Sequence, residues 1–292
     1  MTGLESWRNR EPNLKIRGSC AEALKTVRGF CTIAGEEKEG ETAVTACEWV
    51  RQGERLDDLQ RGGLRIIQRE SGFRFGTDAV LLADFAQAKR GEHIADVGTG
   101  TGVLALLLCA RAEESTIDAF ELQADIADMA LRSVKLNALE SRIRIHHADC
   151  RDAARLIGHE RCQLVVTNPP YTKTGAGLVS PEQTRALSRS DSDCTIDEWM
   201  TACGRLLKNG GRLCCVFPAP RFLELCDAMR AARMEPKRVR FVAARADAAP
   251  KLVLVEGLKG GRPSLHLQPL LITHDQSGEF TDEMRRIYGE ES

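Results

Sequence analysis

The fold is decided by the stretch HIADVGTGTG at positions 93–102 and by the apolar run VLALLL that follows it at 103–108. The first five residues are typical of a buried strand, and the apolar run is typical of a helix. The glycines between them allow positive φ and let a ligand approach the backbone, while the helix start presents free N–H groups. This strand, turn and helix predict a ligand site where the strand ends.

Strands and helices alternate on the C-terminal side of this stretch. A second strand, at 116–120, ends at Glu121, nineteen residues after Gly102. An acid at that position would hold a ribose diol. A helix is expected at 123–139, a strand at 142–147 that leads to Asp149, and a strand at 164–167 that leads to Asn168. The carboxyl ends of such strands meet at one edge of an open α/β sheet, which is where ligands bind.

The tetrapeptide Asn168-Pro169-Pro170-Tyr171 predicts the chemistry at that edge. Two prolines without N–H groups cannot continue a sheet ladder, so the chain leaves the sheet in a stiff, extended turn. The Asn168 side chain and the Pro169 carbonyl offer two hydrogen-bond acceptors, and Tyr171 offers a flat ring. Two acceptors beside a stacking plane suit a flat, amine-bearing ring such as adenine. Taken alone, the tetrapeptide also fits an ordinary proline-rich turn with a solvated asparagine.

The rest of the chain is expected to complete the sheet. Residues 1–48 are polar and predict a loosely ordered N-terminal extension, with a small folded cap as the alternative, which leaves 49–292 as the folded domain. Before the glycine stretch we expect a helical turn at 55–59, a hairpin of 64–68 with 72–75, and a helix at 79–86. A long polar loop at 172–197 is expected to gate the substrate. Beyond it we expect helices at 196–207, 221–234 and 281–288, a glycine cap at 208–211, strands at 212–217, 237–242 and 251–256, and a further edge at 265–273.

Composition narrows the classes of function. The 292 residues are 42% hydrophobic and 28% charged, as in soluble globular proteins, and the net charge is −1. No overall basic field marks a nucleic-acid binder, so a polyanion would need a local patch. One basic run is a candidate for phosphate contacts, although Glu235 and Asp247 interrupt it and a solvated surface is the alternative. The run comprises Arg230, Arg233, Lys237, Arg238, Arg240, Arg245 and Lys251.

The eleven cysteines contain no C-x-x-C pair, so neither a zinc ribbon nor a redox motif is expected. Their apolar surroundings predict buried, reduced thiols in a cytoplasmic protein. Residues 1–10 lack an apolar signal-peptide core, and no apolar run reaches membrane-spanning length. We expect no metal, because His146 and His147 are adjacent on a strand and their side chains point to opposite faces.

Taken in order, these motifs resemble the Rossmann-like S-adenosylmethionine-dependent methyltransferases that modify amino groups. The resemblance covers residues 54–289, and the motifs are Asp96-x-Gly98-x-Gly100-x-Gly102, Glu121, Asp149 and Asn168-Pro169-Pro170-Tyr171. Segments 64–82, 259–261 and 279–283 resemble the bacterial tRNA(Val) adenine N6-methyltransferase family, which modifies the adenine after the anticodon. The resemblance implies a Rossmann-like, seven-stranded, mostly parallel sheet with helices on both faces and a C-terminal antiparallel strand. It also implies that 49–292 is a methyltransferase domain.

The resemblance implies a role for each motif. S-adenosylmethionine is the expected cofactor and tRNA, held by a local basic patch, is the expected partner. The glycine turn would hold the methionine and sugar region, Glu121 the ribose hydroxyls and Asp149 the adenine ring. The expected cofactor-binding residues are Asp96, Gly98, Gly100, Gly102, Glu121, Asp149 and Asn168. The expected catalytic residues are Asn168, Pro169 and Tyr171, and the expected substrate contacts are Asn168, Pro170, Tyr171 and Lys173.

Other interpretations stay open at this point. The same tetrapeptide is found in protein-glutamine methyltransferases that act on release factors, although those carry a helical N-terminal domain and residues 1–48 are too polar for one. A guanine-directed or DNA adenine enzyme is a third option, and a non-catalytic RNA-binding protein with this fold is a fourth. Val103 breaks the dinucleotide fingerprint of a nicotinamide enzyme. Asp149 could instead cap a helix that begins at Ala153.

Overall fold

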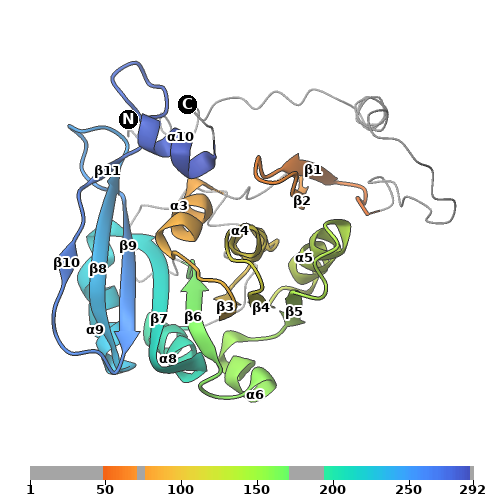
Figure 1. The fold of residues 1–292 in the computed structure, drawn as a ribbon, viewed down its shortest axis with the longest axis horizontal. Helices are drawn as coiled ribbons and strands as arrows, with labels where there is room; N and C mark the ends of the chain where they lie inside the picture. The colour runs from red at the N-terminus through yellow and green to blue at the C-terminus, as the bar shows by residue number, and fades with distance from the viewer. Residues whose placement is uncertain (1–48, 71–75, 171–193, 290–292) are drawn as a thin grey trace, which may run out of the picture. The chain divides into compact units, whose positions relative to one another are not determined.

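A nine-stranded sheet runs through the computed structural model, which describes residues 49–70, 76–170 and 194–289 (Figure 1). The strand order is β10-β8-β9-β7-β6-β3-β4-β5, and β11 pairs with β8. The strands are β3 (His93–Val97), β4 (Thr116–Glu121), β5 (Ile143–His147), β6 (Cys162–Thr167), β7 (Leu207–Pro218), β8 (Met234–Ala243), β9 (Leu252–Lys259), β10 (His266–Leu267) and β11 (Leu271–Ile272). All the elements discussed below belong to the compact unit Gln52–Ser292.

The seven longer strands confirm the predicted sheet. β3 to β7 pair in parallel, whereas β9 is antiparallel to both of its neighbours, β7 and β8. This last long strand therefore lies inside the sheet rather than at its edge. The two additional strands, β10 and β11, have two residues each and come from the segment 265–273. They pair in parallel with β8 and extend the sheet to nine strands.

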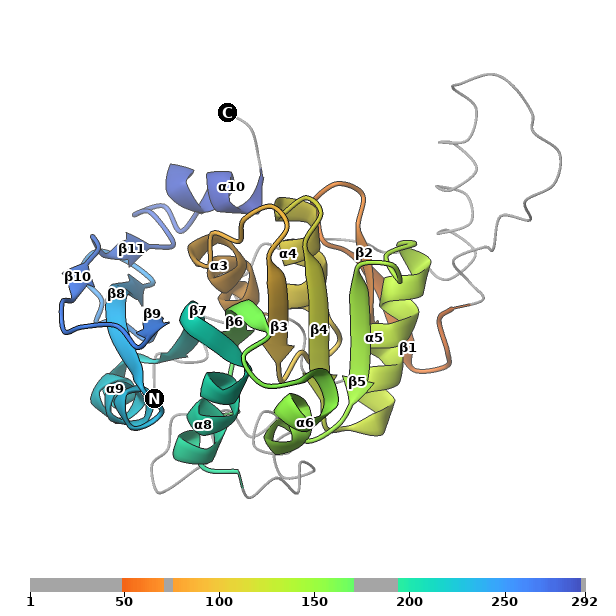
Figure 2. The same ribbon diagram turned by 60° about the horizontal axis from the view of Figure 1, so that its bottom comes forward.

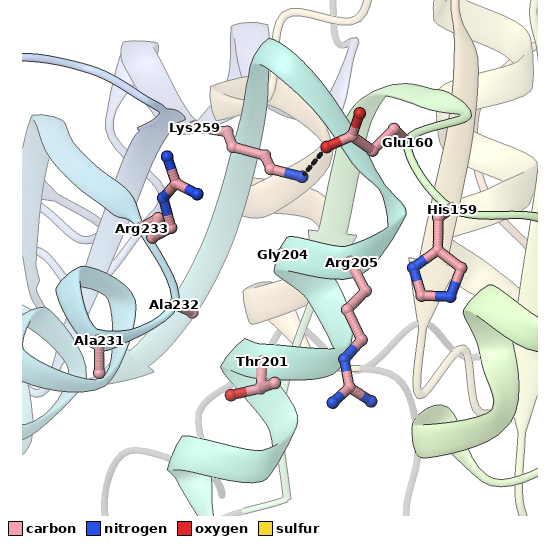
Figure 3. A pocket seen from close by; sticks show the side chains of 9 residues that line it. All are labelled: His159, Glu160, Thr201, Gly204, Arg205, Ala231, Ala232, Arg233 and Lys259. Atoms are coloured by element: carbon pink, nitrogen blue, oxygen red, sulfur yellow. Dashed lines mark hydrogen bonds and ion pairs between the residues drawn. The ribbon is translucent and has the colours of Figure 1, made fainter.

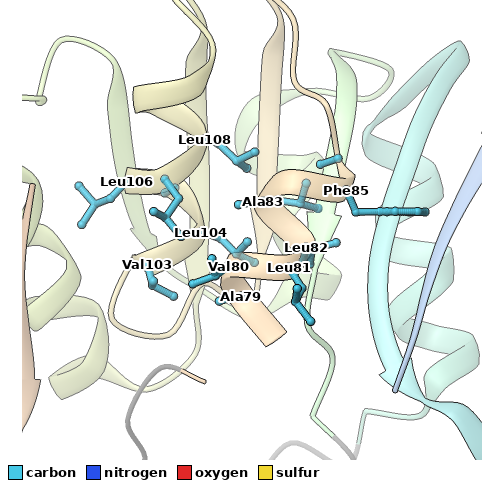
Figure 4. Close-up of a cluster of buried hydrophobic side chains, with 14 of the residues drawn as sticks. Ala79, Val80, Leu81, Leu82, Ala83, Phe85, Val103, Leu104, Leu106 and Leu108 are labelled. Carbon is cyan, nitrogen blue, oxygen red and sulfur yellow. The ribbon is translucent and has the colours of Figure 1, made fainter. Parts of the chain in front are cut away.

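Helices cover both faces of the sheet, as predicted (Figures 1 and 2). They are α3 (Thr77–Phe85), α4 (Val103–Arg111), α5 (Ala124–Leu136), α6 (Ala153–Ile157), α8 (Ile196–Leu206), α9 (Phe222–Ala231) and α10 (Asp282–Tyr288). Alternate residues of the strands feed two separate apolar cores, because neighbouring side chains point to opposite faces. In β6, Leu164 and Val166 join the core with α3 and α4, while Val165 joins the core with α8 and α9. Figure 4 shows the contribution of α3 and α4 to the first core.

Two local predictions are wrong. Residues 55–59 do not form a helical turn, because β1 (Glu54–Asp58) pairs antiparallel with β2 (Arg65–Arg69). Tertiary contacts hold this hairpin: Arg132 of α5 binds both carboxylate oxygens of Glu54 at 2.7 Å. The partner expected for 64–68, at 72–75, lies outside the described residues. The helix cap expected at 208–211 is instead the start of β7, where the register shifts opposite Cys162.

None of the helices in the described residues is sufficiently long and apolar to cross a membrane. All eight described cysteines are free and buried, in agreement with the expected thiols. Among the described residues, no cluster of three or more His, Cys, Asp or Glu side chains could hold a metal ion. His146 instead contacts Asp118 at 2.6 Å, while His147 contacts the Leu122 carbonyl at 3.0 Å.

Candidate active site

The sheet register brings the predicted motifs to one edge. Val97, the last residue of β3, pairs with Thr167, the last residue of β6. Gly98 and Asn168 therefore follow the ends of neighbouring parallel strands at the same level. On the other side of β3, Val97 pairs with Phe120, so Glu121 lies beside Gly98. The sheet thus places Glu121 and Asn168 on either side of the glycine turn.

The same edge has room for an elongated ligand. The strand order β6-β3-β4-β5 places Asn168 first, then the glycine turn, then Glu121 and then Asp149, which follows the end of β5. Three strand spacings separate β6 from β5, or about 14 Å at about 4.8 Å per spacing. A nucleoside with an amino-acid arm could lie along this edge, with its arm on the glycine turn.

The glycine turn has the backbone that the sequence predicts. Gly98, Gly100 and Gly102 have φ values of +76°, +59° and +92°. The N–H groups of Gly98 and Thr99 both donate to the Phe120 carbonyl at 2.9 Å, which ties the turn to β4. A Cβ atom on Gly100 would meet no described atom within 4 Å, so the space above this residue is open to a ligand.

Glu121 is nearly buried, with 8% of its surface exposed, and it faces the glycine turn. Its Oε2 accepts from the Gly100 N–H at 3.0 Å and its Oε1 from the Gln123 N–H at 2.9 Å. Desolvation raises the pKa of this carboxyl, and the backbone donors oppose the rise. These two backbone donors leave about two of its roughly four acceptor positions for a hydroxyl.

Asp96 is fully buried in β3, one residue before Val97. Its Oδ2 accepts from the Thr99 hydroxyl at 2.6 Å, so it orders the glycine turn from below. Its Oδ1 has no hydrogen-bond partner among the described residues. Burial raises the pKa of this carboxyl to about 7, against the hydrogen bond from Thr99. A buried, unpaired oxygen at the base of the turn would be satisfied by a positively charged donor such as an amino-acid ammonium group.

The raised pKa of Asp96 predicts a pH-dependent stability for the cofactor-free protein. Because the folded-state pKa of about 7 exceeds the unfolded value of 3.8, the stabilisation is complete below pH 4 and is lost as the pH rises through 7. We expect the free energy of unfolding to fall by about 2.5 kcal/mol between pH 5 and pH 8 from this group alone. Urea titrations at both pH values should show this decrease, and Asp96→Asn should remove it. An equal decrease in Asp96→Asn would assign the pH dependence to other groups.

Asp149 caps a helix, which was the alternative to a ligand-binding role. The capped helix begins at Cys150, one turn before the expected start at Ala153. Asp149 is the N-cap of this 3-10 helix, Cys150–Asp152, and its Oδ1 accepts from the Arg151 N–H at 2.8 Å. Its Oδ2 accepts from the Arg151 guanidinium at 2.7 Å. These bonds from Arg151 hold the pKa of the carboxyl below its usual range. The carboxylate is therefore ionised and fixed in orientation at the end of β5.

Asn168 leaves β6 partly buried, followed by the buried Pro169 and the partly buried Pro170. The stiff exit from the sheet is thus at the predicted position. Tyr171 and Lys173, together with the expected gating loop as far as 193, lie outside the described residues. The stacking role of Tyr171 stays a prediction.

Two residues of this edge were missed by the sequence analysis. Trp199 of α8 is 7% exposed, and its indole Nε1 donates to the Thr167 hydroxyl at 2.8 Å. A Cβ atom on Gly98 would lie 2.9 Å from the ring of Trp199. Nothing in the sequence links these residues, because Trp199 and Thr167 are 32 positions apart. The one available signal is a tryptophan on the apolar face of a helix that follows the tetrapeptide.

The basic run between 230 and 251 does not form one surface. Arg238 pairs with Glu256 at 2.8 Å and Arg240 with Glu283 at 2.7 Å, so internal carboxylates take up both charges. Arg233 precedes β8 and lines a pocket of about 340 Å³ with Arg205 and Lys259 at the opposite edge of the sheet (Figure 3). Two members, Arg245 and Lys251, flank the loop between β8 and β9 at the same edge as Asn168. Arg245 is also paired, with Asp247 at 3.5 Å, so the described residues do not form the predicted single basic patch.

Comparisons with known proteins agree with this geometry. A family model described as methyltransferase small domain matches residues 71–235. A curated tRNA1(Val) (adenine(37)-N6)-methyltransferase of Porphyromonas gingivalis is 28% identical over 231 residues, covering 76% of this chain and 89% of that protein. A protein of the same name from Tolumonas auensis is 30% identical over 191 residues, covering 65% of this chain and 78% of that protein.

Solved structures share the fold. A predicted O-methyltransferase from Agrobacterium tumefaciens superposes with a TM-score of 0.60 at 25% identity, covering 73% of this chain and 96% of that one. The Thermus thermophilus 16S rRNA N2 G1207 methyltransferase, in complex with AdoMet and guanosine, has a TM-score of 0.51 at 17% identity. The superposition covers 72% of this chain and 51% of the Thermus chain. At this identity the likeness concerns the fold alone.

Proposed function

The chain belongs to the methyltransferase small-domain family and, within it, to the tRNA1(Val) (adenine(37)-N6)-methyltransferases, and from that premise we propose that it methylates N6 of adenine 37 in tRNA1(Val). S-adenosylmethionine is the methyl donor. The observation that supports the proposal is the pairing of Val97 with Thr167, because Gly98 and Asn168 then follow the ends of neighbouring strands. A methyl donor bound at the glycine turn would then lie next to an amine that is hydrogen-bonded to Asn168.

The residues at the edge suit each part of S-adenosylmethionine, which supplies a methyl group on a positively charged sulfur. The ammonium group of its methionine arm would satisfy the unpaired Oδ1 of Asp96. The open space above Gly100 would admit the arm. Glu121 would accept from a ribose hydroxyl, and the fixed carboxylate of Asp149 from the adenine amino group.

Asn168 would act on the amine of the target adenine. The lone pair of this amine is delocalised into the purine ring, so the amine is a poor nucleophile. Two acceptors on its hydrogens, the Asn168 side chain and the Pro169 carbonyl, would draw it towards a tetrahedral geometry with the lone pair aimed at the methyl group. No strong base is needed, because the amine becomes acidic only after transfer. Alignment of two reactants can supply roughly 7 to 11 kcal/mol of the barrier reduction.

Recognition of the tRNA extends beyond this amine. Tyr171 and Pro170 would stack on the extruded base, at about 1 to 3 kcal/mol for a stacking aromatic, with Lys173 as a neighbouring phosphate contact. Arg245 and Lys251 are the members of the basic run that lie at this edge and would contact the tRNA backbone. We assign residues 49–292 to the methyltransferase domain and 1–48 to an N-terminal extension. A tRNA substrate and free thiols support a cytoplasmic location.

The test is methyl transfer onto bulk tRNA from a strain that lacks the enzyme, followed by mass spectrometry of the nucleosides. We expect N6-methyladenine at position 37 of tRNA1(Val) alone. A parallel reaction contains a release factor with its unmodified glutamine. Methylation of the glutamine with none on tRNA would replace the proposal by the protein-glutamine reaction, and failure to bind labelled S-adenosylmethionine would indicate a non-catalytic protein.

A further inference from the structure

Trp199 packs directly on the glycine turn that receives the cofactor. A Cβ atom on Gly98 would lie 2.9 Å and 3.1 Å from two carbons of the indole ring. The ring therefore occupies the space that a side chain at position 98 would need. One face of the turn is shaped by α8, an element whose sequence lies beyond the acceptor tetrapeptide.

The indole is also tied to the strand that carries the acceptor amide. Its Nε1 donates to the Thr167 hydroxyl at 2.8 Å, and that hydroxyl donates to the Val97 carbonyl at 2.7 Å. Thr167 is fully buried, so water does not compete for either bond. A buried indole N–H without an acceptor would cost about 1 to 3 kcal/mol. The three groups therefore hold one another in a single arrangement.

The position of Trp199 is itself fixed by its helix. Thr195 caps α8 in a capping box: its hydroxyl accepts from the Glu198 N–H at 3.2 Å, and Glu198 accepts from the Thr195 N–H at 2.8 Å. Trp199 follows in the first turn and joins the apolar core with Cys203 and Val165. Because the helix and the core fix the indole ring of Trp199, the ring cannot move away from the glycine turn.

We propose that Thr167 and Trp199 are positioning residues that set the distance between the cofactor turn and the acceptor amide. Val97 directly precedes Gly98 and Thr167 directly precedes Asn168, so their hydrogen bond joins the two strands one residue before the reacting groups. The inference rests on the proposed function of the site. A displacement of about 1 Å between aligned reactants can reduce a rate about 100-fold, so a bond at this point controls turnover.

Two variants interrupt this network: Thr167→Val removes both hydrogen bonds at nearly constant volume, and Trp199→Phe removes one bond together with the ring carbons nearest Gly98. Thr167→Val deletes the hydroxyl, and Trp199→Phe deletes the indole N–H while it retains an aromatic ring. We expect each to lower kcat for tRNA methylation about 10-fold to 100-fold, with KM for tRNA and Kd for S-adenosylmethionine changed less than about threefold. Thr167→Ser restores the hydroxyl and is expected to recover most of kcat.

Ser115→Ala is the matched control. Ser115 is fully buried and its hydroxyl donates to the Ala112 carbonyl at 2.6 Å, but it precedes β4 at the opposite edge of the sheet. Ser115→Ala should lower the urea midpoint as Thr167→Val does and leave kcat unchanged. The double variant Thr167→Val with Trp199→Phe should lose little more than Thr167→Val alone, because both act through one network.

Several outcomes would overturn the inference. One is a kcat for Thr167→Val and Trp199→Phe within twofold of the wild type, with only the urea midpoint lowered. Another is a loss of activity that follows entirely from weaker cofactor binding. Thr167 and Trp199 would then support only the cofactor turn and would not set its distance from the acceptor amide. A wild-type enzyme that methylates no tRNA would instead refute the proposed function, and this outcome is separate from the other two.

Discussion

Asn168→Ala is expected to abolish methyl transfer onto tRNA while the affinity for S-adenosylmethionine is nearly retained. The substitution removes the acceptor that aims the target amine, but it leaves Asp96, the glycine turn and Glu121 in place. Loss of one preorganised hydrogen-bonding group in an active site costs roughly 100-fold to 1,000-fold in kcat, and the adenine amine depends on such a group more than a strong nucleophile would. Single-turnover transfer from labelled cofactor measures the loss, and calorimetry measures the binding.

Two further variants make the Asn168 result specific. Asn168→Asp keeps an acceptor at the same position and should retain more turnover than Asn168→Ala. Asn209→Ala removes an exposed asparagine from β7 at the opposite edge, and its kcat should equal that of the wild type. Unchanged turnover in Asn168→Ala would defeat the assigned role, and so would an equal loss in Asn209→Ala.

The predicted parts of the site all follow from one rule. In a sheet of alternating strands and helices, each carboxyl end reaches the same edge, so Asp96, Glu121, Asp149 and Asn168 could be brought together from strand ends alone. Their neighbours could not. The bond between Trp199 and Thr167 depends on where α8 lies against β6, and no local pattern encodes that docking.

The wrong predictions have the same physical origin. Residues 55–58 become part of a strand because β2 pairs with them and Arg132 holds Glu54, the first residue of the same strand. The basic residues lie close together in sequence, but alternate residues of a strand face opposite sides, and the ends of β8 lie at opposite edges of the sheet. Charge clustered along a chain therefore does not predict charge clustered on a surface.

Gly98→Ala is expected to destabilise the enzyme strongly. Its φ of +76° belongs to the left-handed region, which costs a non-glycine residue about 1 to 2 kcal/mol. The added Cβ atom would also lie 2.9 Å from the ring of Trp199, and overpacking of this kind costs about 1 to 3 kcal/mol. We expect a loss of about 3 kcal/mol in the free energy of unfolding, measured by urea titration, together with weaker cofactor binding.

Gly100→Ala distinguishes an effect on cofactor binding from an effect on stability. Gly100 has a φ of +59°, and its added Cβ atom would enter open space, so only the backbone cost of about 1 kcal/mol is expected in stability. If the methionine arm occupies that space, the affinity for S-adenosylmethionine should fall at least about tenfold. Gly210→Ala is the control, because Gly210 has a φ of +76° and equally open surroundings at the far edge of the sheet. It should show the same small loss of stability and bind the cofactor normally, whereas normal binding by Gly100→Ala would move the cofactor away from the turn.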